Sequence, residues 1–241
     1  MKKIILSILL FLSLQVFSQK LFKGVGVFGA LTMSKHEYRN KDTDKKDTSY
    51  TLSHFYPQTH ISREQFSWGA GIFLELSRND NVRWQTELEY VNKGAKEMQV
   101  INYYTGARSG VYVPNKLTYI QWNNYLKFWN PVFASAHWYF MVGVRLEYLF
   151  KYSAPAFTEV VAAFPKFWFS GDLGLGYEFP VTEKIGIFVE EHWNPDIIPH
   201  KFNGNTNVRA RTFETRLGIT YRPRKRRIDD CNAPVYKGPA Y

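Results

Sequence analysis

Residues Trp84–Tyr90 read WQTELEY, and their side chains alternate between an apolar or hydroxyl-bearing series and a polar or acidic series. A period of two is typical of a β-strand with two unlike faces, because successive side chains of a strand point to opposite sides. The stretches 120–128, 140–148 and 169–179 repeat the alternation. The sequence therefore predicts an all-β protein whose sheet has one apolar face and one charged face.

Eight such segments can be counted along the chain. The second, fourth and sixth connections between them are short, whereas the others are longer and the first, Lys35–Gln65, is the longest. Short turns at one end and long loops at the other are typical of outer-membrane barrels, whose short turns are periplasmic. We therefore expect an eight-stranded antiparallel transmembrane β-barrel. Its strands should cover about residues 21–34, 66–78, 82–98, 115–129, 136–152, 166–180, 184–194 and 208–222.

The free energy of placing a charge in lipid determines which face should point outward. On the lipid side of a barrel, a Lys or Arg near the bilayer midplane costs about 2–4 kcal/mol. The apolar face should therefore meet lipid and the charged face should fill the interior. A soluble sandwich or lipocalin-like barrel, which is the alternative fold, buries its apolar face instead. The predicted interior cluster is Glu75, Glu87, Glu89, Lys127, Arg145, Glu147, Asp172, Glu178, Glu214 and Arg216.

A barrel of eight strands has room inside only for its own side chains. We expect the interior cluster to be a solvated or salt-bridged plug that holds the strands in register; an ion path is the alternative. The motif GVGVFG at 24–29 has the spacing of a dinucleotide-binding loop, but it lies within a predicted strand and no helix follows. Glycines inside the strands should instead relieve crowding in a narrow barrel. These are Gly24, Gly26, Gly29, Gly69, Gly71, Gly174 and Gly176.

The first 18 residues, MKKIILSILLFLSLQVFS, combine a basic start with an apolar run and small residues before Gln19. This is the pattern of a cleaved export signal, and the run is shorter than the roughly 20 apolar residues of a spanning helix. A short membrane anchor is the alternative. We expect residues 1–18 to be a signal peptide, 19–222 the barrel and 223–241 a periplasmic tail.

The composition agrees with export and with a folded chain. Of the 241 residues, 45% are hydrophobic and 17% are aromatic, which argues against a disordered protein. A single cysteine, Cys231, excludes an internal disulfide. The net charge of +10 would suit nucleic acid, but an exported chain does not meet it. We therefore expect no nucleic-acid partner.

The last 20 residues, RPRKRRIDDCNAPVYKGPAY, are basic and rich in proline, which discourages a helix. One interpretation is a basic extension that touches anionic headgroups. The other is a docking peptide that becomes ordered on a periplasmic partner. The candidate docking residues are Arg224, Lys225, Arg226, Arg227, Val235, Tyr236 and Tyr241.

Candidate catalytic groups are sparse. His60 and Ser62 flank the predicted start of the second strand, and Glu191 and His192 lie late in the seventh. A Ser–His–acid arrangement near the outer leaflet would favour a lipid-modifying enzyme. No spacing of His, Cys and Asp indicates a zinc site. We expect a non-enzymatic protein with no catalytic, metal-binding or cofactor-binding residues and no cofactor; a lipid-modifying enzyme or a minor channel is the alternative.

Three phrases carry a resemblance to a known family: ELEYVNKGAKE (Glu87–Glu97), LTYIQWNNYLKF (Leu117–Phe128) and LGITYRP (Leu217–Pro223). With the export signal, they resemble the PorT-like outer-membrane β-barrels of Bacteroidota over about residues 20–222. The resemblance implies an eight-stranded barrel without catalytic residues, and some members of that family belong to the type IX secretion and gliding apparatus.

From this resemblance we expect an accessory or structural subunit of a cell-envelope complex. Type IX secretion and gliding come first, and the barrel-assembly or nutrient-uptake machinery comes next. The expected partners are outer-membrane lipid, lipopolysaccharide and proteins of that complex. The basic tail departs from a generic small barrel, which would end at its last strand.

Overall fold

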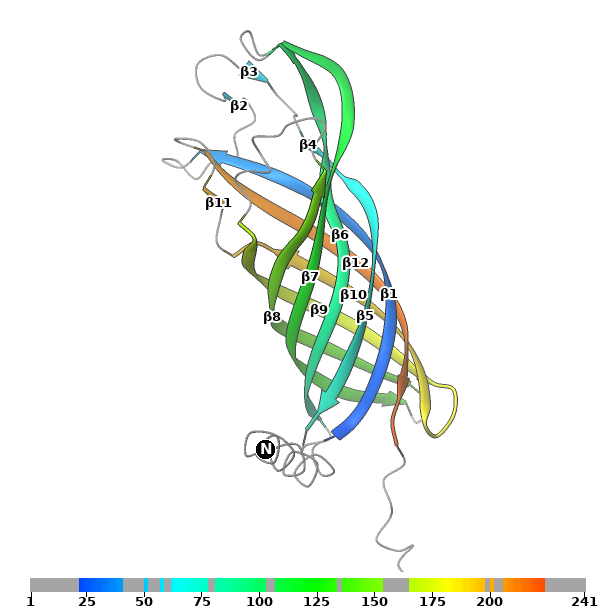
Figure 1. Ribbon diagram of the computed structural model, residues 1–241. Helices are drawn as coiled ribbons and strands as arrows, with labels where there is room; N and C mark the ends of the chain where they lie inside the picture. Colours follow the sequence, from blue (N-terminus) through cyan, green and yellow to red (C-terminus); the bar gives the residue numbers. More distant parts are fainter. Residues whose placement is uncertain are drawn as a thin grey trace, which may run out of the picture.

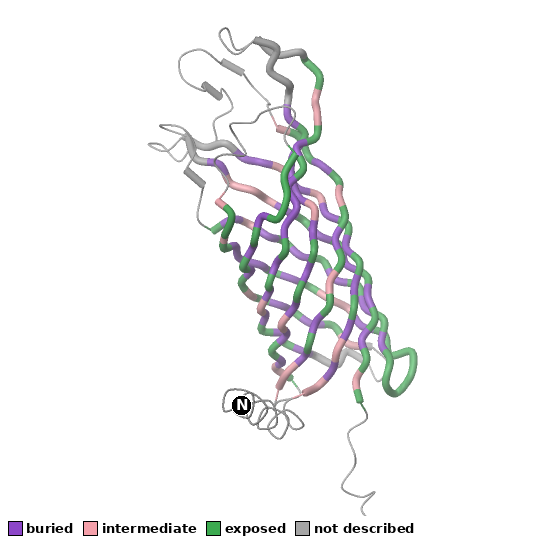
Figure 2. Tube along the Cα trace, viewed as in Figure 1, coloured by how far each residue is buried: buried purple, intermediate pink, exposed green. Residues whose placement is uncertain are grey.

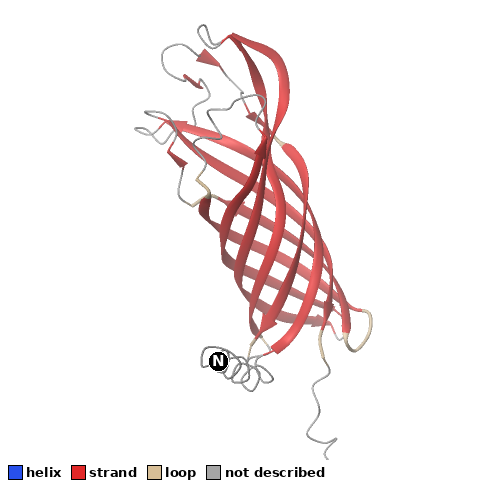
Figure 3. Cartoon of the chain, in the orientation of Figure 1, coloured by secondary structure: helices blue, strands red, loops and turns tan. Residues whose placement is uncertain are grey.

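β-strands make up nearly all of the described residues (Figure 3). The structure is a computed structural model that describes residues 22–40, 50–51, 57–58, 62–77, 81–102, 107–133, 136–153, 165–197, 200–201 and 206–223. Among these residues, no helix is long and apolar enough to cross a membrane. The predicted all-β class is confirmed.

Each long strand covers most of one predicted segment, because alternation of side-chain character and strand pairing report on the same pleated backbone. The elements are β1 (Phe22–Asn40), β2 (Tyr50–Thr51), β3 (Pro57–Gln58), β4 (Ser62–Arg63), β5 (Gln65–Leu76), β6 (Val82–Asn102), β7 (Ala107–Phe133), β8 (Ala136–Ser153), β9 (Phe167–Pro180), β10 (Ile185–Pro195), β11 (His200–Lys201) and β12 (Thr206–Tyr221).

Antiparallel pairing joins β1, β5, β6, β7, β8, β9, β10 and β12 in that order, and β12 also pairs with β1. The backbone hydrogen bonds therefore run in a ring (Figure 1). The β1–β12 ladder continues without a register shift from Val25↔Tyr221 to Asn40↔Thr206. Short strands β4 and β11 add to β6 and β12. The predicted antiparallel order along the sequence is confirmed, and we call these paired strands the ring.

The two ends of the ring differ in their connections. The connections 77–81, 134–135 and 181–184 are short and share one end with the start of β1 and the end of β12 (Figure 1). We call this end the short-turn end and the opposite one the long-loop end. The start and the finish of the ring therefore lie together at the short-turn end.

Two predicted loops are shorter than expected. Lys35–Asn40 was assigned to the first loop but continues β1, paired with β12 as far as Thr206. The third connection is not a long loop. β7 pairs with β8 only from Lys116 onward, but its earlier residues, back to Ala107, still pair with β6. These segments lack apolar alternation, and their strand conformation is stabilised by backbone hydrogen bonds to a neighbour rather than by a buried apolar face.

Buried and exposed residues alternate along the strands of the ring (Figure 2). The buried positions hold most of the charged side chains and the exposed positions hold large apolar ones, which is the inverse of a soluble sheet. The side chains of Arg145 and Arg216 point into the ring and are 0% exposed. Leu31, Leu217 and Phe66 point away from it and are 70%, 61% and 74% exposed. The outer surface is thus apolar and the interior holds the charges.

The interior also contains a small aromatic group opposite glycines. The rings of Phe73 and Phe188 meet edge to face with centroids 5.6 Å apart, and Phe28 packs beside Phe73. A Cβ added at Gly71 would lie 2.8 Å from Cε1 of Phe28, so this position has no room for a side chain. Gly29 was expected to relieve crowding in the same way, and that expectation is wrong. It is exposed on the outer face, and a Cβ there would meet no heavy atom within 4 Å.

The contrast between these two glycines gives a matched test. Gly71→Ala should destabilise the protein by about 1–3 kcal/mol, because the added methyl group forces the Phe28 ring out of its position. Gly29→Ala should change stability by less than about 0.5 kcal/mol. Urea unfolding in detergent or lipid, followed by tryptophan fluorescence, measures both. Equal effects from the two substitutions would contradict the packing described above.

Candidate functional site

The ring encloses a buried ionic network, and this is the candidate functional site. Its members come from β5, β6, β7, β8, β9, β10 and β12, so it connects most of the ring. The structure places every residue of the predicted interior cluster inside the ring, where all of them are buried. These are Glu75, Glu87, Glu89, Lys127, Arg145, Glu147, Asp172, Glu178, Glu214 and Arg216.

Two guanidinium groups form the centre of the network. Arg145 on β8 donates to Asp172 on β9 and, at 2.9 Å, to Glu214 on β12. Arg216 on β12 donates to Glu214 at 2.6 Å and reaches across the ring to Glu87 and Glu89 on β6, at 2.9 and 2.8 Å. Glu214 is thus shared by both cations. Charge-assisted bonds of this kind are roughly twice as strong as neutral ones.

A buried histidine extends the network along β10. Nδ1 of His192 lies 2.9 Å from Asp172, and Nε2 lies 3.2 Å from Glu190. Two tyrosines donate to the same carboxylates: Tyr139 to Glu190 at 2.7 Å and Tyr125 to Asp172 at 2.9 Å. Each carboxylate therefore has more than one donor, which buried charges require.

The short-turn end carries a second group of cations around Trp129. Arg222, directly after β12, donates to Glu75 at 3.0 Å and to Glu178 at 2.9 Å. The guanidinium carbons of Arg83 and Arg222 lie 3.9 and 4.7 Å from the centroid of the Trp129 ring. Burial lowers the pKa of Arg222, but the carboxylates of Glu75 and Glu178 raise it by more, to above its usual value. We call these five residues the end clamp.

Several members of the network lie outside the predicted interior cluster. Arg83, Glu190, His192 and Arg222 were not among the predicted interior residues, although all four have the inward parity of their strands. Extending the inward parity to the start of β6, over all of β10 and past the end of β12 would have found them. Arg222 was instead counted with the basic tail, because polarity alone does not show that its side chain turns back into the ring.

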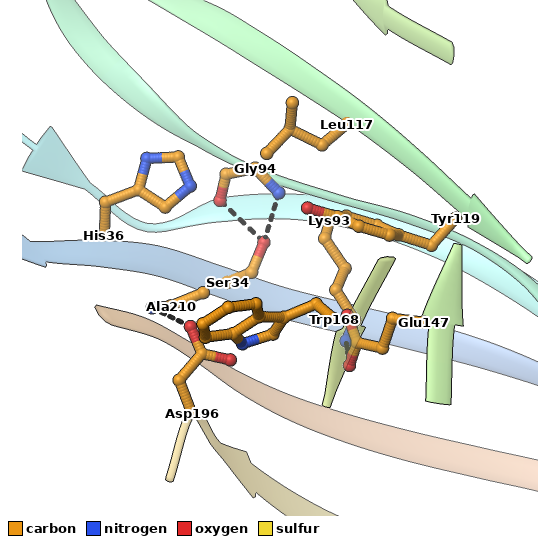
Figure 4. Close-up of a pocket in the computed structure, with 10 residues that line it drawn as sticks. All are labelled: Ser34, His36, Lys93, Gly94, Leu117, Tyr119, Glu147, Trp168, Asp196 and Ala210. Carbon is orange, nitrogen blue, oxygen red and sulfur yellow. Dashed lines mark hydrogen bonds and ion pairs between the residues drawn. The ribbon is translucent and has the colours of Figure 1, made fainter. Parts of the chain in front are cut away.

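Near the long-loop end the ring contains a cavity of only about 10 Å³ (Figure 4). Lys93 donates to Glu147 at 2.9 Å on one side of it, and Ser34 bonds to both backbone groups of Gly94 on the other. This volume holds about one water molecule and no larger ligand. The lining residues are Ser34, His36, Lys93, Gly94, Leu117, Tyr119, Glu147, Trp168, Asp196 and Ala210.

The described members of the alternative Ser–His–acid arrangement do not come together. His192 points into the ring, whereas the adjacent Glu191 is on the outer face. The hydroxyl of Ser62 accepts the backbone N–H of His36 at 3.3 Å, and His60 lies outside the described residues. The described parts of the chain contain no group of three side chains that could hold a metal ion. The docking candidates Arg224, Lys225, Arg226, Arg227, Val235, Tyr236 and Tyr241 also lie outside the described residues.

No family model matches this sequence, and no curated protein matches it significantly. Solved structures with a similar arrangement include outer-membrane proteins of low identity. The outer membrane protein OprG of Pseudomonas aeruginosa is 9% identical, with a TM-score of 0.49 over 85% of this chain and 98% of that one. AlkL in lipid bilayers is 10% identical, with a TM-score of 0.47 over 86% and 92%. Neisserial surface protein A is 11% identical, with a TM-score of 0.41 over 82% and 97%. Likenesses at this level carry no argument about role.

The network predicts a large effect for the loss of one central cation. Arg145→Met should destabilise the protein by about 3–5 kcal/mol, because it leaves Asp172 and Glu214 buried with one fewer cation. The control is Lys35→Met, which removes an exposed pair with Glu64 and should cost less than about 1 kcal/mol. Denaturant unfolding of both variants measures the difference. A cost for Arg145→Met as small as that of the control would contradict the network.

Proposed function

We propose that this protein is a closed, eight-stranded β-barrel of the outer membrane. The observation that carries the proposal is the inverted burial, in which Arg145 and Arg216 are fully enclosed and the outer wall exposes residues such as Leu31 and Leu217. In water, such a wall would be a large apolar patch of the kind that drives association. In lipid it is the favourable surface, and a ring of hydrogen bonds leaves no backbone edge unpaired in the bilayer.

The connections and the termini support one orientation. Short turns are periplasmic in bacterial barrels, so the short-turn end and its end clamp would face the periplasm. The expected export signal at residues 1–18 fits this route, and the basic tail that follows Pro223 would start on the periplasmic side. The β6–β7 hairpin would then extend outward from the cell.

For the molecular role, we propose a non-enzymatic accessory or structural subunit of a cell-envelope complex. The central network is built of side chains that bind one another, and the largest of them, Arg145 and Arg216, are completely buried. Such an interior stabilises a rigid wall and offers no substrate site. The contact with partners would then be the outer wall or the tail.

The resemblance to PorT-like barrels puts type IX secretion and gliding first among such complexes, followed by barrel assembly or nutrient uptake. Outer-membrane lipid and lipopolysaccharide would surround the wall. A minor channel is disfavoured by the filled interior. A lipid-modifying enzyme is disfavoured by the opposite directions of Glu191 and His192.

Co-purification tests the subunit role. The full-length protein, carrying an affinity tag in the connection 154–164, is extracted gently from native outer membranes. It should bring down a defined set of envelope proteins, and truncation after Pro223 should reduce their yield if the tail is the contact. The truncated protein should remain in the outer-membrane fraction, because its ring is complete. Recovery of the full-length protein alone would contradict the subunit role.

A further inference from the structure

One carboxylate lies on the apolar outer wall. Glu191 on β10 is exposed, and its neighbours on the same face of the strand are Val189 and Trp193. Across the ladders it faces Leu175 on β9 and Thr215 on β12. The Thr215 hydroxyl lies 2.8 and 2.9 Å from its two carboxylate oxygens.

Glu191 lies well inside the apolar band of this wall. Four residues further along β10, Pro195 pairs with the charged Arg211, and we take this level as the long-loop rim of the band. Ile185, the first residue of β10, gives the level of the short-turn rim. At about 3.4 Å per residue and a strand tilt of about 40°, Glu191 is about 10 Å below the first level and about 15 Å above the second. An outer-membrane barrel has an apolar band about 25 Å tall, so this depth is within the hydrocarbon.

The surrounding wall gives the carboxylate little compensation. Among the described side chains of β1, β9 and β12, charged residues of the outward parity occur only toward the strand ends, as Lys23, Lys35, Glu37, Arg209 and Arg211. A threonine hydroxyl has one proton to donate, so it satisfies only part of the acceptor capacity of Glu191. Acidic side chains at membrane depth are rare and, where they occur, are paired or functional.

We propose that the β9–β10–β12 face is a docking surface for a different membrane-embedded protein, one that presents a basic or amide side chain to Glu191. Charge complementarity supports this occupant. A second copy related by a twofold axis through this face would bring two carboxylates together in lipid, which is unfavourable. This inference rests on the proposed barrel, and it assigns the contact with a partner to the β9–β10–β12 face of the wall.

The shape of the wall fits the same proposal. Leu217 and Leu175 project beside Thr215 and Glu191, at 61% and 58% exposure. Gly29 pairs with Leu217 and leaves open space next to it on the outer side. Projecting leucines beside an open position can interlock with an apolar partner, with the Glu191 contact near the middle of the patch.

Site-specific photo-cross-linking tests this surface. p-Benzoylphenylalanine is placed at Leu217 or Leu175 in the full-length protein, in native outer membranes, with Leu88 on β6 across the ring as the matched control. We expect one discrete product from Leu217 or Leu175 and none from Leu88. Mass spectrometry should locate the cross-linked peptide in a transmembrane segment of a different protein. Glu191→Leu should lower the yield about tenfold or more, and Glu191→Gln less.

The stability of the isolated protein separates docking from an internal role. Glu191→Leu should leave its denaturant midpoint in detergent or lipid unchanged or raise it, because the wall becomes uniformly apolar. A lowered midpoint with an unchanged cross-link would overturn the proposal, since the Glu191–Thr215 pair would then serve the fold. A product of twice the mass of this chain would overturn it in favour of self-association. Partners that co-purify without any cross-link from this face would overturn it and leave the subunit role standing.

Discussion

The structure depends on the neutralisation of two guanidinium groups inside a ring of strands. Arg145 and Arg216 are removed from solvent, and in that environment an unpaired cation would be strongly destabilising. Their acceptors come from β6, β9 and β12, so strands distant in sequence must all be in register before either charge is satisfied. The network therefore specifies one arrangement of the ring, whether or not it adds net stability compared with an apolar interior.

The same requirement accounts for the end clamp. Arg222 follows the last strand and binds Glu75 on β5 and Glu178 on β9. The residue between β12 and the tail is thereby bonded to two other strands across the short-turn end. The residue from which the tail starts is therefore held to the ring by ion pairs.

Alternation alone predicted the strands and the direction of most side chains. Glu87 and Glu89 alternate with Leu88 and Tyr90, and the structure places the first pair inside and the second outside. Pairings were not predictable in this way. Arg216 and Glu89 are 127 residues apart, and their contact follows from the order and register of strands across the ring. Long-range register has no signature in a single sequence.

β10 shows where polarity becomes ambiguous. It contains two adjacent acids, Glu190 and Glu191, and one of them must face outward whichever parity the strand adopts. Only the register with β9 and β12 assigns Glu190 to the interior with His192 and Glu191 to the wall. The extended pairing of Lys35–Asn40 was missed for a similar reason, because these polar residues carry no alternation and are held by the β12 ladder.

The proposed barrel requires that the outer wall contacts lipid. Nitroxide labels at Val142, Val144 and Leu146, three outward positions of β8, test it in a Cys231→Ser background reconstituted into lipid vesicles. Power-saturation spectroscopy compares their accessibility to oxygen, which partitions into lipid, with that to a water-soluble nickel complex. We expect high oxygen accessibility and low nickel accessibility at all three positions, with oxygen highest nearest the bilayer centre. High nickel accessibility at these positions would contradict the proposed barrel.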